Sequence, residues 1–149
     1  MRAVVQRVTQ ARVTVAGDVV GQIAAGLCVL LSVENGDDET DLRYMTEKLS
    51  GLRIFADAEG KMNRSVLDVQ GAVLLVSQFT LHGDVRRGKR PGFTAAMQPD
   101  QARVWVDRCA QSLRALGLQV AEGIFGADMQ VTLVNDGPVT ILLDSRKLF

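Results

Sequence analysis

The residue types best suited to chemistry stand close together between positions 77 and 82. Ser77, Thr80 and His82 supply two hydroxyl groups and the chain's single imidazole, the combination from which activated nucleophiles are built. We expect these residues on an extended strand, where Thr80 and His82 share one face and Ser77 points to the other. No carboxylate partner for His82 is indicated by the sequence. The pattern therefore favours exposed hydroxyls and a surface imidazole at a strand end over a catalytic triad.

A basic segment follows, with four cationic side chains in five positions. Arg86, Arg87, Lys89 and Arg90 surround Gly88, in a chain whose formal net charge is zero. One interpretation is a solvated loop. The other is a contact with phosphate groups, which arginine binds through two hydrogen bonds and which glycine allows the backbone to approach. A cluster of this kind does not by itself distinguish the two interpretations.

Gly137 and Pro138 form a second unusual feature, between two runs that are typical of strands. Only about 5–6% of X-Pro bonds in folded proteins are cis, so a trans bond is the ordinary expectation. A cis bond at this position would turn the chain sharply and expose both flanking carbonyl groups. Such carbonyls would be rigid acceptors that recognise the geometry of a ligand rather than its identity.

Length and composition exclude several classes of protein. The chain has 149 residues, 47% hydrophobic and 23% charged, which predicts one folded domain over residues 1–149. Lys and Arg total 17, as do Asp and Glu, so the chain is not held to nucleic acid by bulk charge. A single histidine, two cysteines and the lack of GxGxxG, Walker A and HExxH motifs predict neither a metal centre nor a cofactor.

No targeting segment or membrane span is expected. The first residues lack the long apolar core of a signal peptide. The longest apolar run, residues 27–31, is too short to cross a bilayer. Cys28 and Cys109 each lie in an apolar stretch and are expected to be buried, reduced thiols. The predicted location is the cytoplasm.

The elements that must position these residues are mostly strands. Apolar periodicity predicts one helix over about residues 42–52 and a second between Pro99 and Gly117. Strand patterns, with a hairpin turn at 16–18, cover residues 3–8, 12–15, 19–23, 27–33, 53–56, 72–76 running on through 77–81, 118–120, 129–134 and 139–143. No regular strand–helix–strand alternation is expected. The prediction is an α+β fold with a β-barrel-like, largely antiparallel sheet covered by two helices.

Two segments resemble the signature motifs of the D-aminoacyl-tRNA deacylase family, also called D-tyrosyl-tRNA(Tyr) deacylases. They are Ser77-Gln78-Phe79-Thr80-Leu81 and Asn135-Asp136-Gly137-Pro138-Val139-Thr140. The likeness extends to residues 1–8, 51–55, 60–63, 90–94 and 126–129. It therefore covers essentially the whole chain.

The resemblance implies an enzyme that hydrolyses the ester between a D-amino acid and the 3′-terminal adenosine of tRNA. It also implies removal of glycine from mischarged tRNA, no need for a metal, and a cytoplasmic homodimer with active sites at the subunit interface. Ser77, Gln78, Phe79 and Thr80 would line the pocket around the scissile ester. Either Thr80 is the nucleophile, or the 2′-hydroxyl of the RNA assists while backbone groups stabilise the oxyanion. We favour the second route because the sequence offers no clear base for Thr80.

The second motif is implied to act as a chiral filter. Gly137 and Pro138 would form a cis dipeptide that enters the partner subunit's pocket, where its carbonyls hold the substrate's α-amino group and exclude an L side chain. Glycine, which has no side chain, would pass this filter. Three further residues would support the pocket or the terminal adenosine: Arg7, Met129 and Asn135. The basic segment would contact phosphates at the acceptor end of the tRNA, without sequence preference.

His82 marks a departure from the family pattern, which usually has Tyr-Ala-Asp where this chain has His82-Gly83-Asp84. A histidine base is therefore not expected, and a His82→Ala variant is expected to keep most of the activity. Two other functions stay open. One is a non-catalytic module that binds RNA ends, and the other is a hydrolase of another small ester, which would act on a free D-amino-acid ester without RNA.

Overall fold

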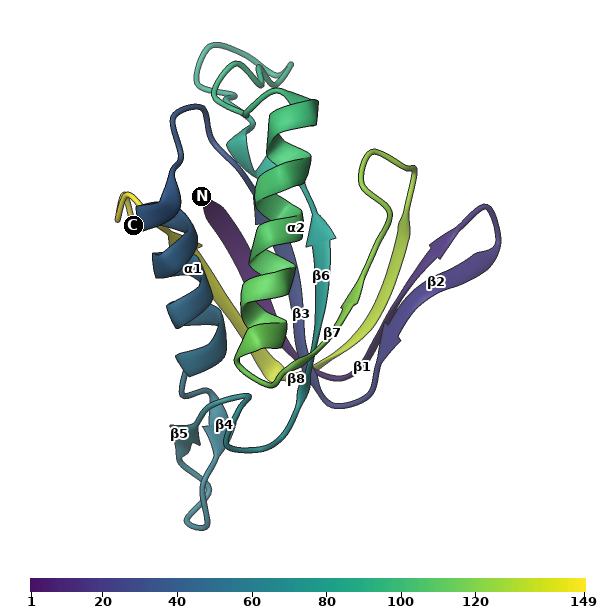
Figure 1. Cartoon of the computed structure of the whole chain (residues 1–149), viewed down its shortest axis with the longest axis vertical. Helices are drawn as coiled ribbons and strands as arrows, with labels where there is room; N and C mark the ends of the chain where they lie inside the picture. Colours follow the sequence, from purple (N-terminus) through teal and green to yellow (C-terminus); the bar gives the residue numbers. More distant parts are fainter.

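The computed structural model describes all 149 residues as a curved sheet with two helices on one face (Figure 1). The strand order is β2-β1-β3-β6-β7, with β8 paired to the other side of β1. The strands are β1 (Arg2–Val15), β2 (Asp18–Ile23), β3 (Gly26–Ser32), β6 (Ala72–Ser77), β7 (Gln119–Glu122) and β8 (Gln130–Asp144). The helices are α1 (Glu39–Gly51) and α2 (Pro99–Ala115). The two short strands β4 (Phe55–Ala56) and β5 (Met62–Arg64) form a separate hairpin.

The barrel-like α+β architecture is confirmed, but the expected lack of strand–helix–strand alternation is wrong. β1 pairs antiparallel with β2, β3 and β8, whereas β3, β6 and β7 are parallel to one another. α1 therefore lies in the crossover from β3 to β6, and α2 in the crossover from β6 to β7. Strands buried on both faces have continuous apolar sequences. This is the pattern of both β3 and β6.

The sheet curls until β2 approaches β7 without pairing with it. A Cβ atom at Gly21 of β2 would lie 2.3 Å from the carbonyl oxygen of Glu122 in β7. Only glycine allows two backbones to come this close. The near closure of the barrel therefore depends on one residue without a side chain.

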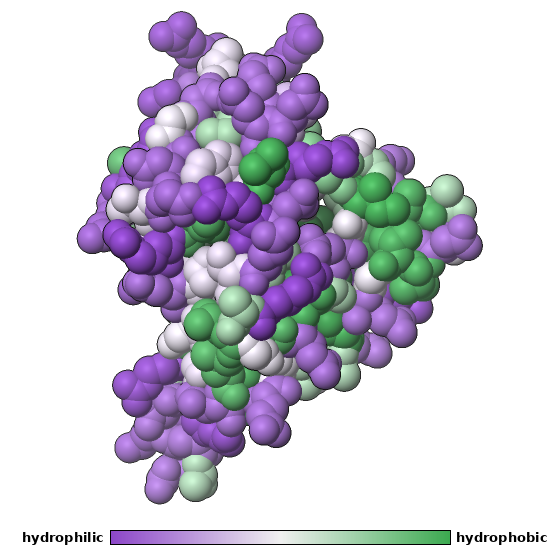
Figure 2. Space-filling view, in the orientation of Figure 1, coloured by the Kyte–Doolittle hydropathy of each residue, from purple (hydrophilic) through white to green (hydrophobic).

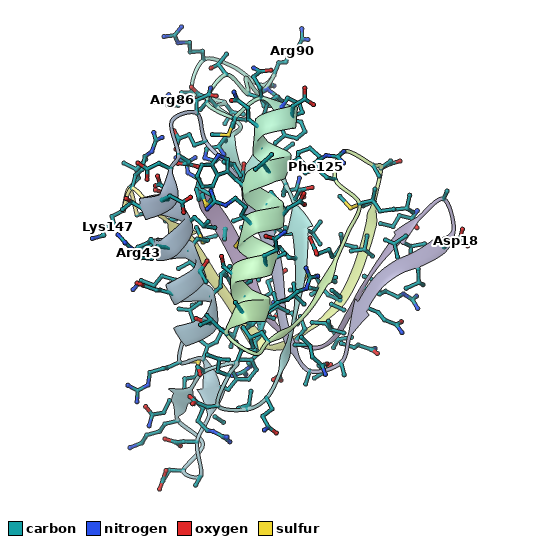
Figure 3. All side chains as sticks on the ribbon, in the orientation of Figure 1. Asp18, Arg43, Arg86, Arg90, Phe125 and Lys147 are labelled. Atoms are coloured by element: carbon teal, nitrogen blue, oxygen red, sulfur yellow. The ribbon has the colours of Figure 1, made fainter.

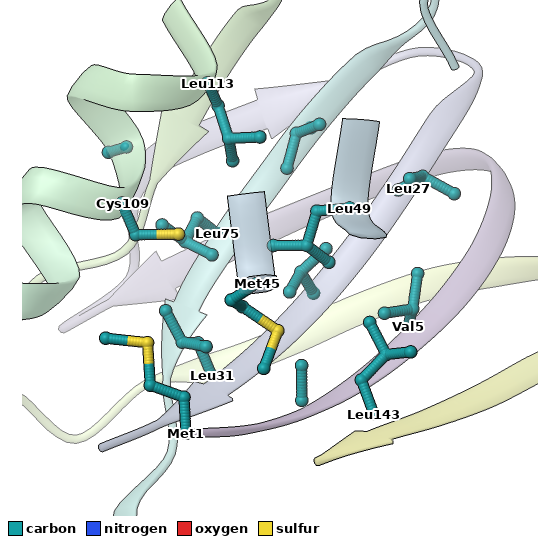
Figure 4. Packing of buried hydrophobic residues seen from close by; sticks show 14 of the residues in the cluster. Met1, Val5, Leu27, Leu31, Met45, Leu49, Leu75, Cys109, Leu113 and Leu143 are labelled. Atoms are coloured by element: carbon teal, nitrogen blue, oxygen red, sulfur yellow. The ribbon is translucent and has the colours of Figure 1, made fainter. Parts of the chain in front are cut away.

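The core lies between the sheet and the helices. Leu31 and Leu75 from the parallel strands meet Met45 of α1 and Cys109 of α2 in a cluster of 22 buried residues (Figure 4). A smaller cluster on the opposite face of the sheet contains Cys28. Both cysteines are free and buried, as expected. Burial raises the pKa of Cys28 to about 11 and that of Cys109 to about 12. Neither helix has the length and apolar character that a membrane span requires.

Two strand assignments from the sequence are wrong. β6 ends at Ser77, and the chain then forms one turn of 3-10 helix, η1 (Phe79–His82), in place of the expected strand over 77–81. The residues expected to separate two strands at 135–138 instead lie within the single strand β8. β1 is long enough to pair with both halves of β8, so the strand continues through the local turn signal.

Candidate active site

A cleft of about 550 Å³ lies at the carboxyl ends of the parallel strands β3 and β6. This is the edge at which open parallel sheets bind ligands. Four segments form its walls: the end of β3, the end of β6 with the start of η1, the loop before α2 with the first half of that helix, and the loop between β7 and β8. The lining residues are 31–33, 76–79, 93, 96–99, 102, 106, 125–129 and 131.

The cleft is mainly apolar. Thirteen of its 20 lining residues are hydrophobic, and Asp128 is the only ionisable one. Phe125, labelled beside α2 in Figure 3, and the α2 residue Val106 belong to its apolar wall. The uncharged polar lining residues are Ser32, Ser77, Gln78 and Gln98. Such a surface suits a planar or apolar group held by few hydrogen bonds.

The first predicted motif lies at this cleft. Ser77, Gln78 and Phe79 line it, and Thr80 follows as an exposed residue of η1. Phe79 is 57% exposed and packs edge-on against Phe93, with ring centroids 5.0 Å apart. The Thr80 hydroxyl accepts a hydrogen bond from Gln78 Nε2. No imidazole, amine or carboxylate contacts Thr80, so the structure provides no general base for its hydroxyl.

His82 is not the surface imidazole expected from the sequence, because it is only 3% exposed. Its Nδ1 lies 2.6 Å from Ser32 Oγ, and its Nε2 lies 3.5 Å from Glu34 Oε2. A carboxylate neighbour thus exists, but it comes from the chain after β3. Burial lowers the pKa of His82 below 6.5, and Arg2 lowers it further, although Glu34 acts in the opposite direction. The imidazole is therefore neutral at physiological pH.

Gly137 and Pro138 lie outside the cleft of their own chain. The bond between them is cis, as the resemblance implies. β1 and β8 pair at Val8 with Asn135 and again at Gln6 with Thr140, so residues 136–139 bulge from the ladder opposite a single residue of β1. Both Gly137 and Pro138 are exposed on this bulge.

Arg7 and Asn135 hold this bulge rather than the cleft. Arg7 Nε lies 3.2 Å from the carbonyl oxygen and 3.0 Å from Oδ2 of Asp136, and Arg7 Nη1 donates to the carbonyl of Ile54. Asn135 Oδ1 accepts a hydrogen bond of 3.0 Å from the amide of Val139. Of the three supporting residues predicted, only Met129 lines the cleft.

The basic residues occupy a loop that is closed at its base by two hydrogen bonds between the backbones of Asp84 and Gly92, of 2.8 and 2.9 Å. Figure 3 shows Arg86 and Arg90 at the end of the molecule, beyond the start of α2. Arg86 pairs with Asp84 and holds the pKa of that carboxyl far below its usual range. Arg87, Lys89 and Arg90 are exposed and form no ion pair. The loop returns to the cleft at Phe93.

Several lining residues were missed by sequence reasoning. Ser32 had a usable signal, because it is a polar residue near the end of an apolar run that forms a buried strand. The lining residues after Phe93 and those in the β7–β8 loop come from irregular segments with no pattern of their own. No group of three or more His, Cys, Asp or Glu side chains is arranged to hold a metal ion.

Comparisons with known proteins agree across the chain. A model of the D-Tyr-tRNA(Tyr) deacylase family matches residues 4–144. The D-aminoacyl-tRNA deacylase of Symbiobacterium thermophilum is 61% identical over 149 residues, covering 100% of this chain and 99% of that protein. The protein of the same name from Desulfitobacterium hafniense (strain DSM 10664 / DCB-2) is 59% identical, with complete coverage of both chains.

Solved structures share the fold. The c-Myc DNA Unwinding Element Binding Protein superposes with a TM-score of 0.91 at 44% identity, over 97% of this chain and 98% of that one. A probable eukaryotic D-amino acid tRNA deacylase gives a TM-score of 0.82 at 20% identity, over 95% and 97% of the two chains. The family match, the full-length relatives and the signature residues at the cleft lead to one assignment: the chain belongs to the D-Tyr-tRNA(Tyr) deacylase family.

Proposed function

We propose that the chain hydrolyses the ester bond of D-aminoacyl-tRNA at the cleft beside η1, releasing the D-amino acid and the tRNA. Family membership makes the chain a hydrolase of the aminoacyl-tRNA ester. The observation that carries the placement of the site is that Ser77, Gln78 and Phe79 line an apolar cleft at the carboxyl ends of two parallel strands. The apolar wall suits the terminal adenosine, with Met129 as part of that wall.

Hydrolysis in this proposal does not use Thr80 as a nucleophile. A threonine hydroxyl needs a neighbouring base, and only the Gln78 amide contacts this one. The 2′-hydroxyl of the terminal ribose of the tRNA assists the hydrolysis of the ester instead. The amides of Phe79 and Thr80 open η1 and have no hydrogen-bond partner within that turn. They are the backbone donors for the oxyanion that forms on the ester carbonyl.

Gly137 and Pro138 supply the chiral filter in a homodimer. They are exposed and do not line their own cleft, which supports a role in the partner subunit's cleft. Their carbonyls hold the substrate's α-amino group, exclude an L side chain, and let glycine pass. β8 has a strand partner on one side only, and its Val131, Val134 and Leu142 are exposed. An exposed strand edge with apolar side chains favours a dimer in which the partner subunit covers it.

Exposed apolar residues of β2 form another part of the surface that suits contact with a second protein chain. Figure 2 shows a largely hydrophilic face, with hydrophobic side chains gathered at the end of the molecule that β2 forms. Val19 and Val20 of β2 are 50% and 38% exposed.

Beyond the start of α2, the exposed cations of the basic loop contact phosphates of the tRNA acceptor end (Figure 3). The loop joins the cleft at Phe93, so phosphate contacts and the ester site are adjacent.

The deciding experiment is a paired deacylation assay. The same tRNA is charged with D-tyrosine, L-tyrosine or glycine, and ester loss is followed with and without a chelator. Loss of the D and glycyl esters, unaffected by chelator, with the L ester intact, is the expected result. Binding without hydrolysis would replace this proposal with an RNA-end-binding module. Equal loss of the D and L esters would refute the chiral filter but would be consistent with the proposed ester hydrolysis.

Mixing two variants tests whether each active site contains residues from both subunits. A Gln78→Ala subunit and a Gly137→Asp subunit are each expected to be inactive alone. Random heterodimers of the two contain one intact site, so the mixture recovers roughly a quarter of wild-type activity. No recovery in heterodimers confirmed by mass would show that each subunit supplies its own complete site.

A further inference from the structure

A buried polar group lies behind η1 and is not used in the proposed reaction. His82 and Ser32 are 3% and 2% exposed, and the pair is linked by the 2.6 Å contact between Nδ1 and Oγ. Ser32 Oγ also lies 3.4 Å from the carbonyl oxygen of Phe79. On the other side of the ring, Nε2 faces Glu34 Oε2 at 3.5 Å, and neither of these two atoms has another partner. The group therefore connects the end of β3 to the turn that carries the first motif.

Ser32, His82 and Glu34 have the residue types of a Ser-His-Glu triad, but the serine hydroxyl is not accessible to a substrate. In such a triad the serine must reach the scissile carbonyl. Ser32 is almost completely buried, and its hydroxyl is enclosed by His82 and the Phe79 backbone. What the contacts provide is a link between the imidazole and the backbone of η1. Arg2 supports the same turn directly, because its Nη1 donates to the carbonyl of Leu81.

The protonation state of His82 decides the direction of the hydrogen bonds. In the neutral ring that satisfies both neighbours, Nε2–H faces Glu34 and Nδ1 accepts the Ser32 hydroxyl proton. In the cationic ring both nitrogens donate. Ser32 Oγ then accepts from Nδ1, and its own proton is free to be donated to the Phe79 carbonyl. Protonation thus transfers the Ser32 hydrogen bond from His82 to the backbone of the motif.

We propose that His82 is a positioning residue: its neutral ring keeps the Ser32 hydroxyl proton away from the Phe79 carbonyl, and this sets the position of the Phe79 and Thr80 backbone at the ester site. This inference rests on the proposed function of that site. His82 touches neither substrate nor reacting atoms. Because the oxyanion donors are backbone amides of the same turn, a displacement of the turn changes their distance from the ester carbonyl. Catalysis by positioned donors is sensitive to such displacements.

The charges that face the imidazole come from several elements. Arg2 of β1 and the N-terminal ammonium oppose its protonation, whereas Glu34 and Asp37 favour it. Arg146 lies 3.1 Å from Glu34 Oε1 and 3.5 Å from Asp37 Oδ1. Burial is the largest influence and lowers the pKa of His82. The neutral arrangement therefore holds at physiological pH, and the cationic arrangement forms on acidification.

Two variants separate positioning from packing. His82→Asn keeps a polar group where Nδ1 meets Ser32 but does not titrate, and His82→Leu keeps apolar volume without the hydrogen bond. With D-tyrosyl-tRNA at neutral pH, we expect the Leu variant to lose about tenfold in kcat with KM little changed. This replaces the expectation from the sequence that most activity survives the loss of His82. The Asn variant is expected to recover most of that loss. The kcat of the wild type is expected to show an inflection at the pKa of His82, and the Asn variant none.

The single histidine allows a direct spectroscopic test in untagged protein. The ¹⁵N shifts of one imidazole report its tautomer and pKa, and both are expected to change in Ser32→Ala. Unchanged shifts would overturn the contact on which the proposal depends. Equal kcat in the Leu and Asn variants, at equal folded fraction, would overturn the positioning role. A loss above about a hundredfold in the Asn variant would make His82 a catalytic base instead. An inactive wild type would refute the proposed function itself.

Discussion

Replacing Gly137 with alanine tests whether the bulge on β8 is a geometric filter. Gly137 has a φ of +125°, which side chains disfavour. A Cβ atom would lie 2.7 Å from Val139 Cγ2, 3.0 Å from Arg7 Nη2 and 3.1 Å from the Val139 amide nitrogen. The arginine end can move, but the valine contacts belong to the bulge itself. The carbonyls on either side of Pro138 must therefore shift.

The size of the effect follows from these contacts. A non-glycine residue held in this backbone region costs about 1–3 kcal/mol, which lowers Tm by roughly 2–4 °C per kcal/mol in a chain of this size. A displacement of about 1 Å in a positioned group can reduce the rate by up to a hundredfold. We expect kcat/KM for D-tyrosyl-tRNA to fall at least about tenfold. The ratio of D to L hydrolysis should fall with it.

Gly17→Ala is the matched control. Gly17 has a φ of +93° in the turn between β1 and β2, and a Cβ atom there would meet nothing within 4 Å. The variant should lose similar stability but keep its deacylation rate and enantiomer ratio. Both variants are compared with the wild type by thermal unfolding and by initial rates on D- and L-tyrosyl-tRNA. If Gly137→Ala keeps the wild-type enantiomer ratio, the filter does not depend on this bulge.

Four further results are expected. Thr80→Val should keep single-turnover deacylation within about a hundredfold of wild type, and a larger loss would restore its hydroxyl as the nucleophile. Arg87→Ala should weaken tRNA binding equally for every charged amino acid and reduce the salt slope by about one, as measured by filter binding. The thiol of Cys109, whose pKa is about 12, should resist a disulfide reagent at pH 8 until the chain unfolds. Partial burial acts to raise the pKa of Asp41, but a hydrogen bond from Ser145 holds that pKa below 3.8. Asp41 therefore stabilises the fold above that pH, and this contribution is lost as the pH falls through the lowered value. Asp41→Asn should flatten the fall of Tm below pH 4.

The helices could be predicted because their signals are local. α1 begins at the capping box of Asp38 and Asp41, and α2 begins at Pro99 in a position that tolerates proline. Each presents one apolar face to the sheet. The number of helices and their approximate bounds thus follow from residues that are neighbours in the sequence.

The parallel part of the sheet was harder to recognise. β3 and β6 are short apolar runs with no alternation, and such runs do not show which strand lies beside them. Their parallel pairing requires α1 to cross over between them. The cleft exists only because the two strands end at the same edge. A reading of the sequence that expects mostly antiparallel neighbours therefore misses the place where the site forms.

His82 shows why residue types alone misjudged the site. On a continued strand it would be a surface imidazole, but η1 turns it inward to Ser32, 50 positions away in the sequence. The first motif likewise contributes few reactive side chains: an amide, a phenyl ring and hydroxyls without a base. If hydrolysis depends on backbone amides and on carbonyls of a bulge, its chemistry resides in backbone position. Backbone position is set by contacts between distant segments, so a search for reactive residue types finds little even where the fold has assembled a complete site.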